Sequence, residues 1–151
     1  VSTGSLLIPN RLDKLIVHLS GSGSLSHTGG ASFQKYPFDT VDTDTGGIWD
    51  STDKRVIPRL IGSYMCILSV GSTTAGDECA AAVVLNGTTQ YRYTGTIKSN
   101  ILGGNQAFCV ALVYCNGTTD YLEGWMWLNA TRTRVSGSDA TNNVFQVIGP
   151  M

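Results

Sequence analysis

The chain has 151 residues and a formal net charge of −1, so it most simply forms one domain around a single core. Hydrophobic residues make up 42% of the chain and charged residues only 14%, whereas about a quarter of the residues are charged in ordinary globular domains. No basic excess is present to bind nucleic acid or an anionic membrane surface, and no apolar run is long enough to span a bilayer. The abundance of Gly, Ser and Thr favours strands and turns over long helices.

Residues 1–31 are expected to form an N-terminal arm and linker rather than a second domain. The opening VSTGSLLIPN has no basic region followed by a long apolar run, so no signal peptide is expected. One apolar cluster fits a short helix and a strand equally well, and it consists of Leu12, Leu15, Ile16 and Leu19. The following GSGSLSHTGG is typical of a flexible linker.

From residue 32 onward, short apolar runs alternate with turn signals roughly every ten residues, which predicts a β-sandwich or barrel over residues 32–151. Asn86-Gly87 and Asn116-Gly117 predict tight hairpin turns. We expect strands near 33–41, 54–58, 62–71, 79–86, 89–97, 105–115, 120–129 and 143–149.

Some of these strands are apolar on both faces. In AFCVALVYC, the side chains of Phe108, Val110, Leu112 and Tyr114 face one way, and the residues between them are apolar as well. A strand of this kind is covered on both sides. A second sheet can cover one face and a neighbouring subunit the other, so the sequence predicts an oligomer.

The acidic run DTVDTDTGGIWDSTD is the best candidate for a metal site. Asp42, Asp44, Asp50 and Asp53 place oxygen ligands close together, and a calcium loop uses carboxylates at alternate positions before a Gly. The twelfth position of such a loop is Asp53 here rather than Glu, and no flanking helices are evident. We therefore favour a polar loop whose Asp side chains accept hydrogen bonds from nearby backbone N–H groups, and we predict neither a metal nor a cofactor.

Catalytic signatures are missing from the sequence. There is no G-x-S-x-G motif, and the two histidines, His18 and His27, lie in the arm and linker. A glycosidase needs two carboxylates across a groove, and nothing in the placement of Glu78 and Glu123 indicates such a pair. We therefore expect that the protein is not an enzyme.

The four cysteines form no CxxC pair and lie far from the histidines, which argues against a zinc site. We expect them to be small buried apolar residues, although one or two disulfides remain open. They are Cys66, Cys79, Cys109 and Cys115.

Two aromatic pairs are candidates for binding. Tyr91 and Tyr93 share a face in TTQYRYTG, with Arg92 opposite, and burial and exposure are equally expected for them. Trp125 and Trp127 share a face in YLEGWMWLN, and for them burial in the sandwich or in a subunit interface is favoured.

The order of several segments resembles the C1q/TNF-like jelly roll, especially the form found in bacteriophage virion proteins. The segments are FDTVDTDTGGIWD, VIPRLIGSYMCILSV, CAAAVVLNGTT, AFCVALVYC, TDYLEGWMWLN and FQVIGP, and together they cover about residues 33–150. In that family a Trp-Asp turn precedes a strand marked by Pro, Gly and Tyr. The corresponding residues here, to which the resemblance assigns structural roles, are Trp49, Pro58, Gly62 and Tyr64.

The chain departs from this family at two places. Thr119 stands where the family usually has Gly before an Asp-Tyr pair, and Ala80-Ala81-Ala82 replaces a strand that is often rich in Arg. The resemblance nevertheless implies an all-β sandwich of two antiparallel sheets. It also implies a homotrimer packed around a threefold axis through one sheet, with a binding or structural role and no catalysis.

Two functions follow as expectations. The first is a homotrimeric virion protein on the surface of a phage or phage-like particle, which decorates the capsid or forms a spike or fibre head for host attachment. Its partners would be capsid or tail proteins through the arm, and a host surface glycan or protein. The alternative is a secreted C1q-like module that binds proteins or glycans. The cysteines and three glycosylation sequons, at Asn86, Asn116 and Asn129, favour that alternative.

Overall fold

Strands account for the regular secondary structure of the residues that the computed structural model describes, namely 14–21, 30, 32–72, 78–93, 95–99, 104–131 and 143–151. The strands are β1 (Leu15–Ser20), β2 (Gln34–Lys35), β3 (Thr40–Asp44), β4 (Trp49–Asp50), β5 (Arg55–Val56), β6 (Gly62–Ser72), β7 (Cys79–Leu85), β8 (Thr89–Tyr93), β9 (Gly95–Ser99), β10 (Gly104–Cys115), β11 (Leu122–Leu128) and β12 (Val144–Gly149). Within these residues there is no helix that could cross a lipid bilayer.

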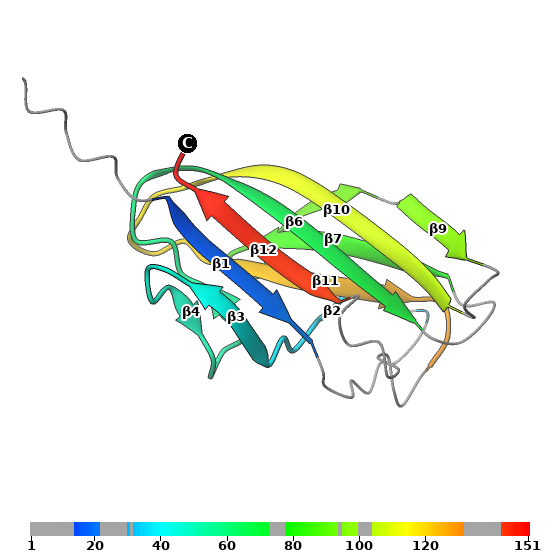
Figure 1. Ribbon diagram of the computed structural model, residues 1–151. Coiled ribbons are helices and arrows are strands. Elements are labelled where there is room, and N and C mark those ends of the chain that lie inside the picture. Colours follow the sequence, from blue (N-terminus) through cyan, green and yellow to red (C-terminus); the bar gives the residue numbers. More distant parts are fainter. Residues whose placement is uncertain are drawn as a thin grey trace, which may run out of the picture.

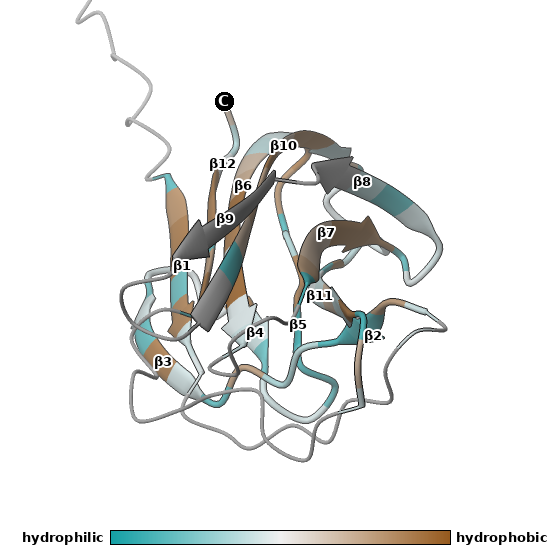
Figure 2. Cartoon of the chain, turned by 90° about the vertical axis from the view of Figure 1, so that its right-hand side faces the viewer, coloured by the Kyte–Doolittle hydropathy of each residue, from teal (hydrophilic) through white to brown (hydrophobic). Residues whose placement is uncertain are grey.

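The strands form two six-stranded antiparallel sheets, which confirms the predicted all-β sandwich (Figure 1). The first sheet has the order β3-β1-β12-β6-β10-β9. The second has the order β4-β5-β11-β7-β8, and β2 also pairs with β11. Figure 2 shows the layers from the side, with β1, β12 and β6 in one and β7 and β11 in the other.

Alternation along the strands fills the space between the sheets. Every second residue of β6 is fully buried there, beginning at Tyr64, while the residues between them are partly exposed over most of the strand. The same period places one side of β10, β11 and β12 in the core. Side chains of this core include Tyr64, Cys66, Leu68, Val70, Cys109, Val113, Leu122, Met126, Leu128, Phe145 and Val147.

Strand β1 corrects the predicted domain boundary. Leu15–Ser20 lies between β12 and β3 in the first sheet, and Val17 and Leu19 are completely buried. These residues therefore belong to the jelly roll, and the interpretation of the whole of residues 1–31 as an arm outside it is wrong for this strand. Local periodicity allowed either a helix or a strand here. The choice is made by pairing with β12, a strand nearly the whole chain away.

The predicted strand 33–41 is instead two short strands, β2 and β3, joined by a segment that packs into the core. Tyr36 and Phe38 are 1% exposed, and their ring centroids lie 4.6 Å apart. Phe38 also stacks on Phe145 at 5.8 Å. Pro37 between them cannot donate a ladder hydrogen bond. Gly124 leaves room for Phe38, because a Cβ there would lie 2.9 Å from its ring.

The predicted strand 89–97 is divided between the two sheets. Strand β8 pairs with β7 in the second sheet, whereas β9 pairs with β10 in the first. The chain thus changes layers between β8 and β9. A strand that switches sheets at a corner is a usual feature of sandwiches.

The Asn86-Gly87 hairpin turn between β7 and β8 is present as predicted. The predicted hairpin at Asn116-Gly117 is wrong, because these residues lie in the connection from β10 in the first sheet to β11 in the second, beside the Asn86 turn. Asn86 and Gly87 have φ values of 54° and 68°, the positive values that a type I′ turn requires. The Asn116 Oδ1 atom accepts hydrogen bonds from the backbone N–H groups of Thr118 and Thr119, both at 2.9 Å. Asn86 Nδ2 donates to Asp120 Oδ1 at 2.8 Å, which links the two turns.

Candidate functional site

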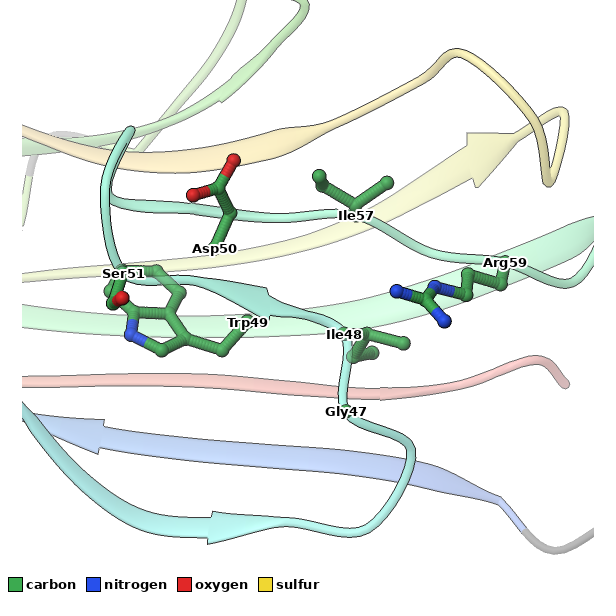
Figure 3. Close-up of a pocket in the computed structure, with 7 residues that line it drawn as sticks. All are labelled: Gly47, Ile48, Trp49, Asp50, Ser51, Ile57 and Arg59. Carbon is green, nitrogen blue, oxygen red and sulfur yellow. The ribbon is translucent and has the colours of Figure 1, made fainter.

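A shallow hollow of about 340 Å³ lies beside the β4–β5 hairpin. In Figure 3 the side chains of Asp50 and Ile57 point to one side of the hairpin, Trp49 points to the other, and Arg59 extends from the following loop. The lining residues are Gly47, Ile48, Trp49, Asp50, Ser51, Ile57 and Arg59. Its polar and charged side chains, Asp50, Ser51 and Arg59, offer hydrogen-bonding and ionic contacts.

The side chains of Asp44 and Asp50, near this hollow, accept hydrogen bonds from backbone N–H groups. Asp44 Oδ1 accepts from the backbone N–H of Ile48 at 3.0 Å, and Asp44 Oδ2 accepts from that of Trp49 at 3.0 Å. Asp50 Oδ1 accepts from the N–H groups of Thr52 and Asp53 at 3.0 and 3.1 Å. This is the arrangement that the favoured interpretation of the acidic run describes.

Ion pairing and backbone hydrogen bonds set the electrostatics of the same turn. Arg55 contacts Asp50 Oδ2 at 3.2 Å and Asp53 Oδ2 at 2.8 Å. Hydrogen bonds, first of all from the backbone of Asp53, lower the pKa of Asp50. Asp42 lies exposed on β3. Across the described ranges, no three His, Cys, Asp or Glu side chains are grouped so that they could hold a metal ion.

Of the residues that the resemblance marks as structural, Trp49 lies on β4, whereas Pro58, Gly62 and Tyr64 lie where the chain passes from β5 into β6. Trp49 is half-buried against the core, whereas its neighbour Ile48 is 1% exposed. Pro58 is buried. Tyr64 is completely buried and donates its hydroxyl to the Leu60 carbonyl at 2.8 Å.

Gly62 is required where β6 begins. Its backbone φ angle is +149°, a value that residues other than Gly rarely adopt. A Cβ at this position would also lie 2.5 Å from the Cβ of Pro150. The corner between β5 and β6 therefore positions the start of β6 against the end of β12.

Of the two tyrosines on β8, Tyr91 is half-buried rather than fully exposed. Tyr91 is paired with Val83 and packs half-buried against the core, and Cys109 Sγ lies 3.2 Å from its carbonyl oxygen. Arg92 is paired with Ala82, and Tyr93 with Ala81. The side chains of these last two lie outside the described residues.

All four cysteines are buried and none forms a disulfide. Burial raises the pKa of the Cys66 thiol, and burial together with Asp120 raises that of Cys115 to about 12. Thiols of this kind stay protonated and inert at neutral pH.

The two tryptophans of β11 lie on the outer side of the second sheet. Trp125 and Trp127 are half-buried, and neither belongs to the core cluster. Trp125 Nε1 donates to Glu123 Oε2 at 2.9 Å, and Glu123 Oε1 pairs with Lys35 Nζ at 3.0 Å. The sequence does not reveal this network, since nothing local predicts that Lys35 on β2 reaches Glu123.

One row on the outer face of the first sheet is apolar across four neighbouring strands, and the next row places His18 and Gln146 beside Ile67 and Val110. Ile16 on β1 is paired with Ile148 on β12, which is paired with Met65 on β6. Met65 is paired in turn with Leu112 on β10. Paired residues project from the same face, so the four form one row. We call this surface the apolar face, and it comprises Ile16, Met65, Ile67, Phe108, Val110, Leu112, Tyr114 and Ile148.

Strand β10 provides the most exposed part of the apolar face. Val110, Leu112 and Tyr114 are 63, 61 and 59% exposed. Monomeric proteins rarely expose contiguous apolar patches of this kind, and such patches mark interaction surfaces. The predicted two-sided strand is thus covered on one side by the second sheet and open on the other.

Comparison with known proteins identifies the fold. No protein-family model and no curated protein matches the sequence. Murine APRIL in its crystal structure at pH 8.0 matches with a TM-score of 0.63 and 10% identity, over 89% of this chain and 98% of that one. The globular domain of the zebrafish complement 1qA protein matches with a TM-score of 0.56 and 11% identity, over 90% and 94% of the two chains. At these identities the likeness is one of fold, and the fold is a C1q/TNF-like jelly roll.

Proposed function

We propose that this C1q/TNF-like jelly roll is a non-enzymatic binding and structural protein that forms a homotrimer through its apolar face. The observation that carries the proposal is the exposed run on β10, with Leu112 in line with Ile16, Ile148 and Met65. Full burial of a Leu or Ile side chain contributes about 1.5–3 kcal/mol. A second and a third copy of the chain would supply that burial.

The proposed setting is the surface of a phage or phage-like virion. Support for it comes from the ordered motifs, which resemble those of virion jelly rolls over about residues 33–150. The trimer would decorate a capsid, or act as a spike or fibre head that attaches to a host glycan or protein. Residues ahead of β1 would contact capsid or tail proteins.

A secreted C1q-like module is the second candidate. The sequon residues Asn86, Asn116 and Asn129 are all exposed, as glycan attachment requires. Mass spectrometry of the protein from its native source distinguishes the two settings, because glycosylated asparagines would favour the secreted module over the virion protein.

Two measurements test the first proposal. Sedimentation equilibrium of the purified protein is expected to give three times the protomer mass of 16.1 kDa. Incubation with particles that lack the protein, followed by density-gradient centrifugation, is expected to return the protein in the particle fraction. A monomer at micromolar concentration refutes the trimer, and failure to bind particles refutes the virion role.

A further inference from the structure

The outer side of the second sheet carries two neighbouring indoles. We call Trp125 and Trp127 the indole strip. Their strand alternates, with Leu122, Met126 and Leu128 in the core and the indoles on the opposite side. Residues two apart on a strand are separated by about 6.6 Å, so the two rings lie next to each other on one face.

Small residues on β7 form the floor beside the indole strip. Trp125 is paired with Ala82, and Trp127 with Ala80. Although Ala82 and Ala80 point out of the sandwich, they are only 0 and 7% exposed. Paired side chains share a face, so the indoles lie next to these alanines on one side, and Arg92 of β8 is paired with Ala82 on the other.

A buried carboxylate fixes the orientation of one ring. Glu123 is 5% exposed, accepts from Trp125 Nε1 at 2.9 Å, and is neutralised by Lys35 Nζ at 3.0 Å. Lys35 Nζ also donates to the Asp53 carbonyl at 2.7 Å. A carboxylate is costly to bury unless it is paired and hydrogen-bonded. This network holds Trp125 in one position before any ligand arrives, which is how binding sites are preorganised.

We propose that the indole strip binds a saccharide chain, with sugar rings packed on Trp125 and Trp127. A sugar ring has an apolar C–H face that suits a flat indole, and hydroxyl groups at its edge that suit Lys35 and the polar residues around the strip. The proposal rests on the binding role proposed above and names the ligand class. It does not depend on self-association, because the strip and the apolar face belong to different sheets.

The dimensions of the strip favour a saccharide over a protein partner. A stable protein interface covers about 800 Å² on each partner, and its centre is depleted of charged residues. Here two indoles are bordered by the charged Lys35, whose side chain is 37% exposed, and by alanines that offer no anchor. Two indoles about 6.6 Å apart along the strand are spaced for neighbouring sugars of one chain.

The test is a saccharide titration of the full chain. A printed array of neutral and acidic glycans is screened first, and cellohexaose, maltohexaose and array hits are then titrated by calorimetry and by tryptophan fluorescence. We expect saturable binding at submillimolar concentration or tighter. Trp127→Ala should weaken it at least about tenfold, which corresponds to the loss of one stacked ring. Ile61→Ala is the control, because Ile61 is an exposed large apolar side chain in the loop before β6, outside the strip and the hollow, and it should bind like the parent protein.

The positioning role of Glu123 is tested in the same assay. Glu123→Gln keeps an acceptor for Trp125 Nε1 and should retain more affinity than Glu123→Ala, with both variants checked for folding by circular dichroism. The proposal is overturned if no glycan binds at concentrations up to about 10 mM, or if Trp127→Ala binds as well as the parent. It is also overturned if folded Trp127→Ala loses self-association, since the strip would then be a subunit contact. Sedimentation of the parent protein tests trimer formation on its own, independently of the glycan titration.

Discussion

Replacing Leu112 by Asp should abolish self-association while leaving the protomer folded. Leu112 is 61% exposed in the protomer, and full burial of Leu contributes about 1.5–3 kcal/mol, so covering the exposed part contributes about 1–2 kcal/mol per chain. Three chains lose about 3–6 kcal/mol per trimer, and three carboxylates must also leave water without partners. Since about 1.4 kcal/mol is a tenfold change, the association constant should fall at least about a hundredfold.

Sedimentation velocity over a concentration series measures this loss, and circular dichroism checks the fold. The matched control is Ile61→Asp, because Ile61 is equally exposed at 65% but lies in the loop before β6, outside the rows of the apolar face. The control should assemble like the parent. An undiminished trimer in Leu112→Asp, or equal loss in both variants, would show that the apolar face is not the contact.

Three further predictions concern the protomer. Asp44→Ala should lower the free energy of unfolding by about 1–3 kcal/mol, measured by urea denaturation, because the N–H groups of Ile48 and Trp49 lose their acceptor; an unchanged midpoint would contradict the role of this carboxylate. Because the pKa of Asp50 is lowered in the folded state, mainly by the backbone N–H of Asp53, its contribution should be present at neutral pH and be lost as the pH falls below about 4. Asp50→Asn should therefore flatten the stability of the protein between neutral and acid pH, and an identical pH profile would refute this. Cys66 and Cys115, whose pKa values are raised by burial, should not react with a thiol reagent at pH 8 until the protein unfolds, and rapid labelling of the native protein would be inconsistent with the buried core.

The sequence predicts the central strands well because their information is local. Alternation in GSYMCILSV and AFCVALVYC marks β6 and β10 almost to their ends, and the Asn-Gly turns fix where β7 and β10 stop. Strand β1 could not be predicted from such local patterns. Its six residues fit a helix or a strand equally well, and they become a strand by pairing with β12 and β3, which local patterns cannot encode.

In the candidate sites, too, features set by neighbouring residues were predictable, and features set by distant residues were not. Alternation correctly assigns Trp125 and Trp127 to one face of β11, but which sheet face is exposed depends on the layer order. The Lys35–Glu123 pair joins residues 88 positions apart, so it has no signature in either strand. Asp44, by contrast, bonds to residues within five positions, and turn chemistry was enough to predict that role.

A crystal structure of the assembled protein tests the central claim most directly. The account predicts three protomers around a threefold axis, with Val110, Leu112 and Tyr114 of each chain buried against a neighbour, although they are about 60% exposed in the protomer. Protomers that meet through other surfaces, with these three side chains still open to solvent, would contradict it.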